Sequence, residues 1–487
     1  MSNLKSQGTK AFIWDFTGKM AIHGMGFIIS IFLARLLNPS DFGLIAMVMV
    51  IISIATIFTD IGLGSALIQR RHLVPIHYSS VFFFNITIGI LLTVITYLSA
   101  PFIASFFNNN ALIALIEIIS FLFVINAFSA VQSTKLRKEL NYALLTKIAF
   151  ISSIISGIVG ITLAFNGAGV WSLVSQSLTQ AIVYNIIIWL MSDWKPKAEF
   201  SIKALMQLWA FGFRMFLSNL LNLTFGKLDT LIIAKLFEPA TLGYFNRAKS
   251  LDQMVITYSS GSLMSVLFPI LSKVQNNLER FQHIIMKSLG ILTFVVFFLL
   301  GSLYLISHEL VIILFGEKWL QTIEYFKILV LSGFGFPISA LLVNVLSSRG
   351  NSKSFLRLEI YKKIIFGINL SVGFIWGIEG YLYGLLFATL LGVYLNIIFV
   401  SKEIDIEKFK LLKPILIQMI IAILITLFVQ FINKDIALGN FIMLALKGIE
   451  YTFIYLFINK FIDTNSYRYF MDEAKPIYTK LLIRIKR

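Results

Sequence analysis

Apolar segments long enough to cross a lipid bilayer recur along almost the whole of this 487-residue chain. A bilayer core about 30 Å thick needs roughly 20 apolar helical residues to span it. Polar or Gly/Pro clusters such as Asn38-Pro39-Ser40-Asp41 separate the segments and favour helix ends there. We therefore expect an all-α integral membrane protein with about fourteen transmembrane helices, at approximately 13–36, 42–67, 79–104, 111–134, 144–165, 170–191, 206–236, 242–268, 286–307, 323–347, 358–377, 381–400, 414–432 and 440–461.

The composition excludes several other classes of protein. Apolar residues make up 58% of the chain and charged residues 13%, whereas a soluble domain has about 25% charged residues. A disordered chain is polar and highly charged, so disorder is excluded as well. The sequence has no cysteine, its five histidines show no metal-ligand spacing, and it has no GxxxxGK[ST] phosphate loop. We expect no metal, no cofactor, no ATP hydrolysis and no catalytic residue.

Basic residues alternate between the gaps that separate the predicted spans. Every second gap is rich in Lys and Arg, as at Arg70-Arg71 and at Arg137-Lys138, and the gaps between them hold one such residue or none. Basic loops stay on the cytoplasmic side of a membrane. This pattern predicts a multi-pass protein of the cytoplasmic (inner) membrane with both termini cytoplasmic and with a retained first span. The net charge of +17 then reflects orientation and attraction to anionic membrane lipid, and a nucleic-acid partner is not expected.

Two segments exactly 200 positions apart resemble each other. Residues 31–43 read IFLARLLNPSDFG and residues 231–243 read LIIAKLFEPATLG, with identical Ala, Leu, Pro and Gly at four aligned positions. Each copy ends the first span of a six-span set. Because six is even, both sets enter the membrane in the same direction, and such parallel repeats bind substrate at the interface between the halves.

This repeat predicts two parallel six-helix bundles followed by two extra C-terminal helices. The stretch Asp193-Trp194-Lys195-Pro196 is the natural connection between the bundles. We expect an N-terminal bundle over 1–192, a cytoplasmic linker over 193–205, a C-terminal bundle over 206–401, and two additional helices with a basic cytoplasmic tail over 402–487.

Ionisable side chains concentrate in the first, seventh and eighth predicted spans. A charge at the bilayer centre costs about 2.5–3.5 kcal/mol on insertion scales, so each needs a cavity or a partner. In the first span Asp15, Lys19 and His23 recur every fourth residue and share one helix face. The candidates for a cation-lined cavity are Lys19, Arg214, Lys227, Arg247 and Lys249, with Asp15, Asn222, Asp229 and Asp252 as orienting or coupling groups.

A second interpretation of these charges needs no cavity. Asp15 and Lys19 can form an i,i+4 pair near the cytoplasmic end of their helix. Arg214, Arg247 and Lys249 can extend their side chains to the headgroups instead. The sequence leaves both interpretations open. A cation-rich cavity would favour an anionic substrate such as a pyrophosphate or an acidic sugar.

Several motifs together resemble a known transporter family. They are ARLLNPSDFGLIAM (34–47), GKLDTLIIAKLFEPATLGYFNRAKSL (226–251), LFPILSKVQNNLERF (267–281) and LFGEKWLQTIEYFKIL (314–329). Their order and spacing resemble those of the polysaccharide-transporter (Wzx-type) oligosaccharide-lipid flippases. That family belongs to the multidrug/oligosaccharidyl-lipid/polysaccharide (MOP) exporter superfamily.

The resemblance implies a flippase rather than an enzyme. Its members carry undecaprenyl-pyrophosphate-linked oligosaccharide repeat units, for O-antigen, capsule or exopolysaccharide, across the membrane by alternating access through a cationic lumen. Carried onto this sequence, the lumen comprises Lys19, Arg214, Lys227 and Arg247, with Asp229 as orienting partner. The implied partners are the lipid-linked oligosaccharide and membrane lipid, with a polysaccharide polymerase and glycosyltransferases as candidate protein partners.

Two alternatives remain at this point. An ion-coupled multidrug or cation antiporter could have the same fold, but a cleft for cationic drugs should be lined by carboxylates, whereas Lys and Arg are prominent here. A polysaccharide polymerase or ligase would need a sizeable external loop with catalytic groups. The longest predicted external loop, about 308–322, is short and partly apolar.

Overall fold

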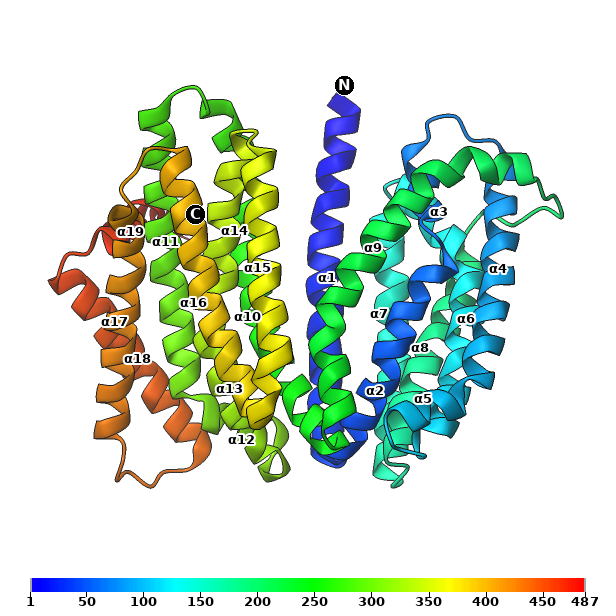
Figure 1. The fold of residues 1–487 in the computed structure, drawn as a ribbon, viewed down its shortest axis with the longest axis horizontal. Coiled ribbons are helices and arrows are strands. Elements are labelled where there is room, and N and C mark those ends of the chain that lie inside the picture. Colours follow the sequence, from blue (N-terminus) through cyan, green and yellow to red (C-terminus); the bar gives the residue numbers. More distant parts are fainter. Residues whose placement is uncertain (1, 486–487) are drawn as a thin grey trace. The chain divides into compact units, whose positions relative to one another are not determined.

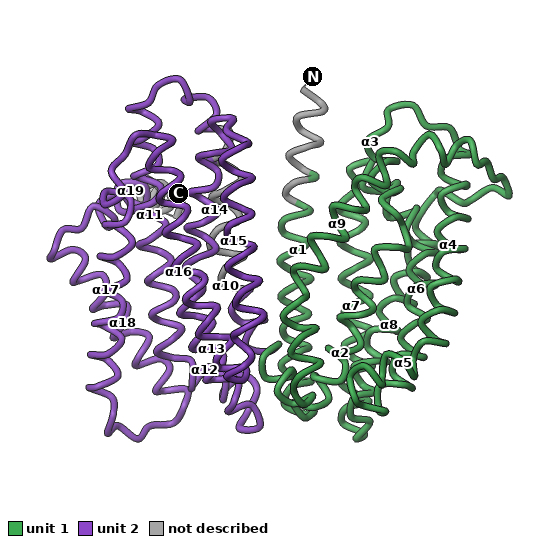
Figure 2. Tube along the Cα trace, viewed as in Figure 1, with its two compact units in different colours: residues 1–246 green, residues 247–487 purple. Residues whose placement is uncertain are grey.

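The computed structural model describes residues 2–485 and consists of helices joined by short connections, with no strand in that range (Figure 1). Side chains are described except those of 2–10, 12–13, 254–266, 268–269 and 477–485. The chain divides into two compact units, residues 1–246 and 247–487 (Figure 2). The all-helical expectation is confirmed over the described residues.

The first unit is built from long apolar helices that pack side by side. Helix α1 packs on α7, α7 on α8, α4 and α8 on α6, and α9 on α2, α3 and α4. The helices are α1 (Ser2–Leu36), α2 (Pro39–Thr56), α3 (Leu63–Gln69), α4 (Pro75–Leu98), α5 (Ala100–Phe106), α6 (Leu112–Lys138), α7 (Tyr142–Phe165), α8 (Val170–Met191), α9 (Ile202–Leu236) and the first turns of α10 (Pro239–Val274).

The second unit contains the rest of α10 and nine further helices over its described residues. Helix α16 packs on α14 and α15, and α11 packs on α17 and α19. The helices are α11 (Leu278–Leu305), α12 (Ser307–Phe315), α13 (Leu320–Ser332), α14 (Gly335–Ser348), α15 (Ser352–Val372), α16 (Gly377–Glu403), α17 (Lys408–Ile432), α18 (Asn440–Phe461) and α19 (Asn465–Ile485).

The order of the helices repeats along the chain. Helices α1 and α9 both have 35 residues and end at Leu36 and Leu236, and a proline begins the next helix three residues later in each case. A long helix followed by a short one occurs later in both halves, as α4–α5 and as α11–α12, and α3 precedes this pair in the first half. Proline suits the first turn of a helix because its missing N–H would have no intrahelical partner there. This order supports the predicted duplication.

The two copies of the repeat lie against each other within the first unit. A Cβ placed on Gly43 would overlap the carbonyl oxygen of Pro239, and a Cβ placed on Gly243 would overlap the carbonyl oxygen of Pro39. The contact is therefore reciprocal, and each glycine is required because the backbone of the other copy occupies the space of a side chain. The sequence predicted that these positions are equivalent but not that they touch.

Eleven helical segments among the described residues are long and apolar enough to cross a membrane. They differ from the predicted spans partly because adjacent helices join: Ser352–Glu403 contains two predicted spans. Helix α9 is absent from the eleven, and it carries Lys203, Arg214, Lys227, Asp229 and Lys235. A multi-pass membrane protein is confirmed, whereas the count of about fourteen stays a prediction.

Several predicted spans contain breaks inside the apolar run. The predicted span 42–67 is divided by a short 3₁₀ turn and by two residues of positive φ, Ile61 and Gly62. The predicted span 323–347 is divided between α13 and α14. The predicted linker 193–205 also packs on α4: Ser79 Oγ accepts from the Lys197 N–H at 3.1 Å, and Ser80 Oγ accepts from the Ser201 N–H at 2.9 Å.

Candidate functional site

A partly open cavity of about 840 Å³, here called the polar cavity, is formed by helices of the first unit. Its walls come from α1, α6, α7, α8 and the break between α2 and α3, so most of the unit contributes to it. The lining combines charged groups of both signs with hydroxyls, and comprises Asp15, Lys19, Ile22, Asp60, Ala130, Ser133, Thr134, Arg137, Tyr142, Leu145, Thr146, Ala149 and Tyr184. Such a lining can hold a ligand that carries both charge and hydroxyl groups.

Helix α1 places Asp15 and Lys19 on this cavity. Lys19 Nζ lies 2.7 Å from Asp15 Oδ2, as the i,i+4 spacing allows. A Cβ on Gly18 would overlap the Thr146 side chain, so the helices α1 and α7 approach closely at this level. The side chain of Lys19 remains 65% exposed despite the ion pair. Its ammonium group therefore keeps donors available for a ligand.

The break between α2 and α3 places Asp60 at the cavity wall. Its carboxylate accepts from the Gly64 N–H, at 2.9 Å to Oδ1 and 3.1 Å to Oδ2, and so caps the start of α3. Gly62 has φ +74°, and a Cβ there would overlap the carbonyl oxygen of Gly212 on α9. The close approach of α9 and the cap on α3 together determine where the carboxylate lies.

Asp60 also lines a second cavity of about 520 Å³. Helix α9 contributes Asn219 and Asn222 to it, α2 contributes Thr56, and α3 contributes Ser65. The predicted orienting residue Asn222 thus lies on a polar cavity wall. Because Asp60 lines both cavities, its carboxylate is the group that they share.

The other predicted residues of α9 lie outside both of these linings. Arg214 is exposed, and its Nε donates to the Ala210 carbonyl oxygen at 3.0 Å. Lys227 is exposed, whereas Asp229 is buried and accepts from the Thr230 N–H at 2.7 Å. Positions two apart on a helix do not face each other. The geometry of α9 therefore does not favour Asp229 as a direct partner of Lys227, and the lumen role of Lys227 stays a prediction.

The predicted residues of α10 are packed within the second unit. Arg247 is 8% exposed, and its guanidinium carbon lies 5.3 Å from the ring centre of Phe315 and 5.5 Å from that of Trp319. These distances are those of cation–π contacts. Asp252 is also 8% exposed, and Lys249 is half-buried. The two aromatic rings hold Arg247, and its substrate role stays a prediction.

Only Asp15 and Lys19 of the larger cavity were predicted from the sequence. The residues that were missed include Asp60, Arg137, Tyr142 and Tyr184. Arg137 belongs to a basic gap between predicted spans, where positive charge already has an explanation in membrane orientation. For Asp60 a signal exists, because an acidic residue followed by Gly62 and Gly64 interrupts an apolar run. No group of three or more His, Cys, Asp or Glu among the described residues could hold a metal ion.

The polysaccharide biosynthesis protein family matches residues 32–324, which is more than half of the chain. The chain belongs to this family. An uncharacterized membrane protein in the cps region of Klebsiella pneumoniae is 25% identical over 438 residues, covering 88% of this chain and 87% of that protein. The lipopolysaccharide biosynthesis protein WzxC of Escherichia coli (strain K12) is 25% identical over 340 residues, covering 68% of each.

The fold of this member of the polysaccharide biosynthesis protein family is also that of a lipid flippase. The inward closed structure of the lipid II flippase MurJ matches with a TM-score of 0.68 at 16% identity, covering 93% of this chain and 100% of that chain. At that identity the likeness concerns the fold. The family match begins at Phe32, so it includes Asp60 and Arg137 but neither Asp15 nor Lys19.

Proposed function

We propose that the chain is a flippase that moves undecaprenyl-pyrophosphate-linked oligosaccharide repeat units across the cytoplasmic membrane by alternating access. Membership of the polysaccharide biosynthesis protein family supports a role in polysaccharide export. The observation that carries the proposal further is the polar cavity of the first unit, whose lining includes the cations Lys19 and Arg137. The chain is a transporter and not an enzyme.

The physical problem of flipping is confined to the head of the substrate. The polyprenyl tail can stay in lipid, whereas a pyrophosphate without compensating groups is very costly to move out of water. Lys19 and Arg137 can supply charge-assisted hydrogen bonds to the phosphate oxygens. The hydroxyls of Tyr142, Tyr184 and Ser133 can exchange hydrogen bonds with sugar hydroxyls. The cavity thus offers partners to both parts of the head.

The carboxylates Asp15 and Asp60 complete this arrangement. Asp15 pairs with Lys19 at 2.7 Å, so the ammonium group has a partner when no substrate is bound. A phosphate that enters the cavity then competes with Asp15 for Lys19. This competition keeps the affinity for the head moderate, which a transporter needs in order to release its substrate. A cleft for a cationic drug would not gain from Lys19 and Arg137.

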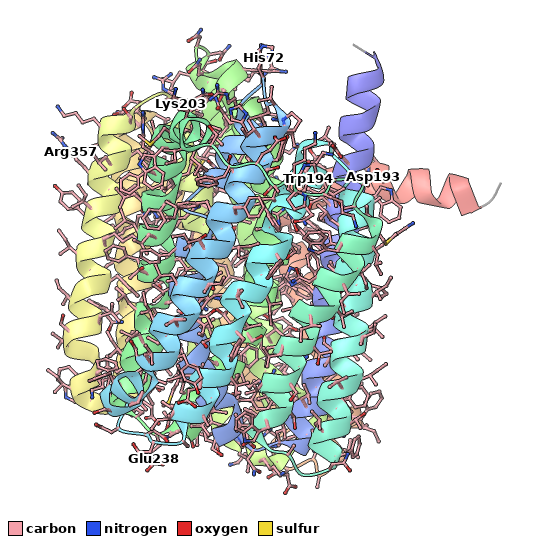
Figure 3. The ribbon with its side chains drawn as sticks, turned by 90° about the vertical axis from the view of Figure 1, so that its right-hand side faces the viewer. His72, Asp193, Trp194, Lys203, Glu238 and Arg357 are labelled. Atoms are coloured by element: carbon pink, nitrogen blue, oxygen red, sulfur yellow. The ribbon has the colours of Figure 1, made fainter. Side chains whose placement is uncertain are left out.

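The proposed topology is the one predicted from the sequence. Two parallel six-helix bundles over 1–192 and 206–401 are joined by the linker 193–205, and 402–487 adds two helices and a basic tail. The repeated helix order supports this plan. Within the first unit, His72 and Lys203 lie at one end of the helices and Glu238 at the other (Figure 3), in agreement with both termini being cytoplasmic. The candidate cations of the lumen stay those predicted from the sequence: Lys19, Arg214, Lys227, Arg247 and Lys249.

The double variant Lys19→Ala/Arg137→Ala is expected to reduce surface polysaccharide at least tenfold. Each substitution removes a hydrogen bond from a charged group, worth about 1.5–3 kcal/mol, and about 1.4 kcal/mol corresponds to tenfold. The measurement is the amount of surface polymer in a strain whose own copy has been deleted, normalised to the amount of the variant in the membrane.

Lys147→Ala is the matched control for this experiment. Lys147 follows the cavity residue Thr146 on α7, but it is exposed and does not line the cavity. We expect this variant to produce wild-type polymer. Wild-type polymer from the double variant would refute the assigned binding cavity, and loss of polymer from Lys147→Ala would show that the assay lacks specificity.

A further inference from the structure

Helix α19 differs in its direction from the long helices of the second unit. In Figure 3 it is the faint red helix that runs across the direction of long helices such as α15. A helix that crosses a bilayer runs along the bundle, whereas a helix in the membrane interface lies across it. The direction of α19 is therefore that of an interfacial helix.

Aromatic side chains fix the first half of α19 to α11. The ring of Phe294 on α11 lies 4.9 Å from that of Phe470 and 5.9 Å from that of Tyr467, measured between centroids. Tyr469 packs on Gly290, where a Cβ would lie 2.9 Å from its Cδ2 atom. Glu473 accepts from Lys287 Nζ at 2.6 Å. These contacts hold the start of α19 on residues 287–294 of α11, the helix whose first turn contains Arg280.

The sequence of the segment 465–487 is amphipathic and strongly basic. Apolar residues recur at three- and four-residue spacings through Ala474, Tyr478, Leu481 and Ile485, the pattern that gives a helix one apolar side. The segment has six basic and two acidic residues, and none of the acidic ones follows Glu473. One of the two, Glu473, is engaged by Lys287. Arg468 pairs with Asp463, and the net charge of the segment is positive.

We propose that α19 binds the anionic phospholipid of the cytoplasmic membrane surface, with its apolar side in the boundary between headgroups and acyl chains. Charge complementarity favours anionic phospholipid as the ligand, because Lys and Arg beside an apolar helix side attract anionic lipid. The proposal rests on the cytoplasmic orientation given above. Through the contact of Phe470 with Phe294, lipid binding would also hold α11 in place.

The absence of cysteine from the chain makes a direct test possible. The variant Ile485→Cys is labelled with an environment-sensitive fluorophore, and the full-length protein is reconstituted into vesicles of phosphatidylcholine alone or of phosphatidylcholine with phosphatidylglycerol. We expect the emission to shift to the blue only in the anionic vesicles. A label at Asp472→Cys, an exposed position, reports on the polar side of α19. It should stay in water in both types of vesicle.

Removing the charge provides the second arm of the test. The variant Lys480→Gln/Arg484→Gln/Lys486→Gln/Arg487→Gln is expected to lower the partitioning of α19 into the surface of anionic vesicles by about tenfold or more. The variant Lys408→Gln/Lys410→Gln, which neutralises two exposed lysines in the first turn of α17, should retain the shift. Equal emission in both vesicle types, or shielding of the label only when a cytosolic protein is added, would overturn the proposal.

This assay measures binding to lipid and not transport. A chain that moves no substrate would still show the blue shift if α19 binds anionic lipid. A chain that supports wild-type surface polymer but shows no shift would refute the role of α19 alone. Failure of the inference and failure of the proposed function are thus distinguishable.

Discussion

Gly243→Ala is expected to destabilise the protein by about 3 kcal/mol or more, whereas Gly226→Ala leaves its stability unchanged or raises it. A Cβ at Gly243 would overlap the Pro39 carbonyl oxygen, and the backbone there cannot move aside as a flexible side chain could. A Cβ at Gly226 would meet no described atom within 4 Å, and alanine favours a helix by about 1 kcal/mol over glycine. Thermal unfolding of the purified variants in detergent measures the difference.

The reciprocal contact provides an independent check on this prediction. Gly43→Ala should destabilise the protein as Gly243→Ala does, because Gly43 meets Pro239 as Gly243 meets Pro39. Gly26→Ala in α1 is the corresponding control, since a Cβ there also meets no described atom within 4 Å. Equal unfolding temperatures for Gly43→Ala and Gly26→Ala would contradict the packing of the two repeat copies.

Asp60→Ala is expected to abolish surface polysaccharide and also to destabilise the protein by about 1–2 kcal/mol. The loss of stability follows from the lost cap on α3, where Asp60 accepts from the Gly64 N–H. The loss of transport follows from the position of the carboxylate on both polar cavities. Asp60→Asn keeps an acceptor oxygen for Gly64 but removes the charge. This variant should have the stability of the wild type but should produce no surface polymer.

Asp41→Ala separates capping from transport. Asp41 is also a capping carboxylate, because its Oδ2 accepts from the Asn38 N–H at 2.9 Å at the start of α2, but it lines neither polar cavity. We expect this variant to lose a similar amount of stability and to retain surface polymer. Wild-type polymer from Asp60→Asn would show that Asp60 acts only as a cap. The assignment of Asp60 to the transport cavities would then be wrong.

Helix ends with local signals could be predicted from the sequence. The prolines at 39 and 239 begin α2 and α10, three residues before the predicted starts at 42 and 242, and Asn141 caps α7 by accepting from the Leu144 N–H at 3.2 Å. Such signals depend on residues within one turn of the helix end. They do not need knowledge of distant parts of the chain.

Breaks inside an apolar run could not be predicted in the same way. The break at Ile61 and Gly62 depends on the backbone of Gly212, which approaches it from α9. The burial of Arg247 likewise depends on Phe315 and Trp319, which are distant in the sequence. Periodicity identified the ionisable residues of α1 as neighbours on one face. It did not show that Arg137 and Asp60 share a cavity with them, since only the packing of α6, α7 and α8 encloses that space.

The central claim is that the chain moves the head of a lipid-linked oligosaccharide between leaflets by means of the cavity around Lys19 and Arg137. The direct test is a leaflet assay with the purified protein in liposomes that contain an undecaprenyl-pyrophosphate-linked oligosaccharide with a fluorescent sugar. An impermeant quencher is added outside. With the wild-type chain, quenching should proceed beyond the outer-leaflet fraction, and with Lys19→Ala/Arg137→Ala it should stop there. Quenching that stops at that fraction with the wild-type chain, or that is the same for both proteins, would contradict the account.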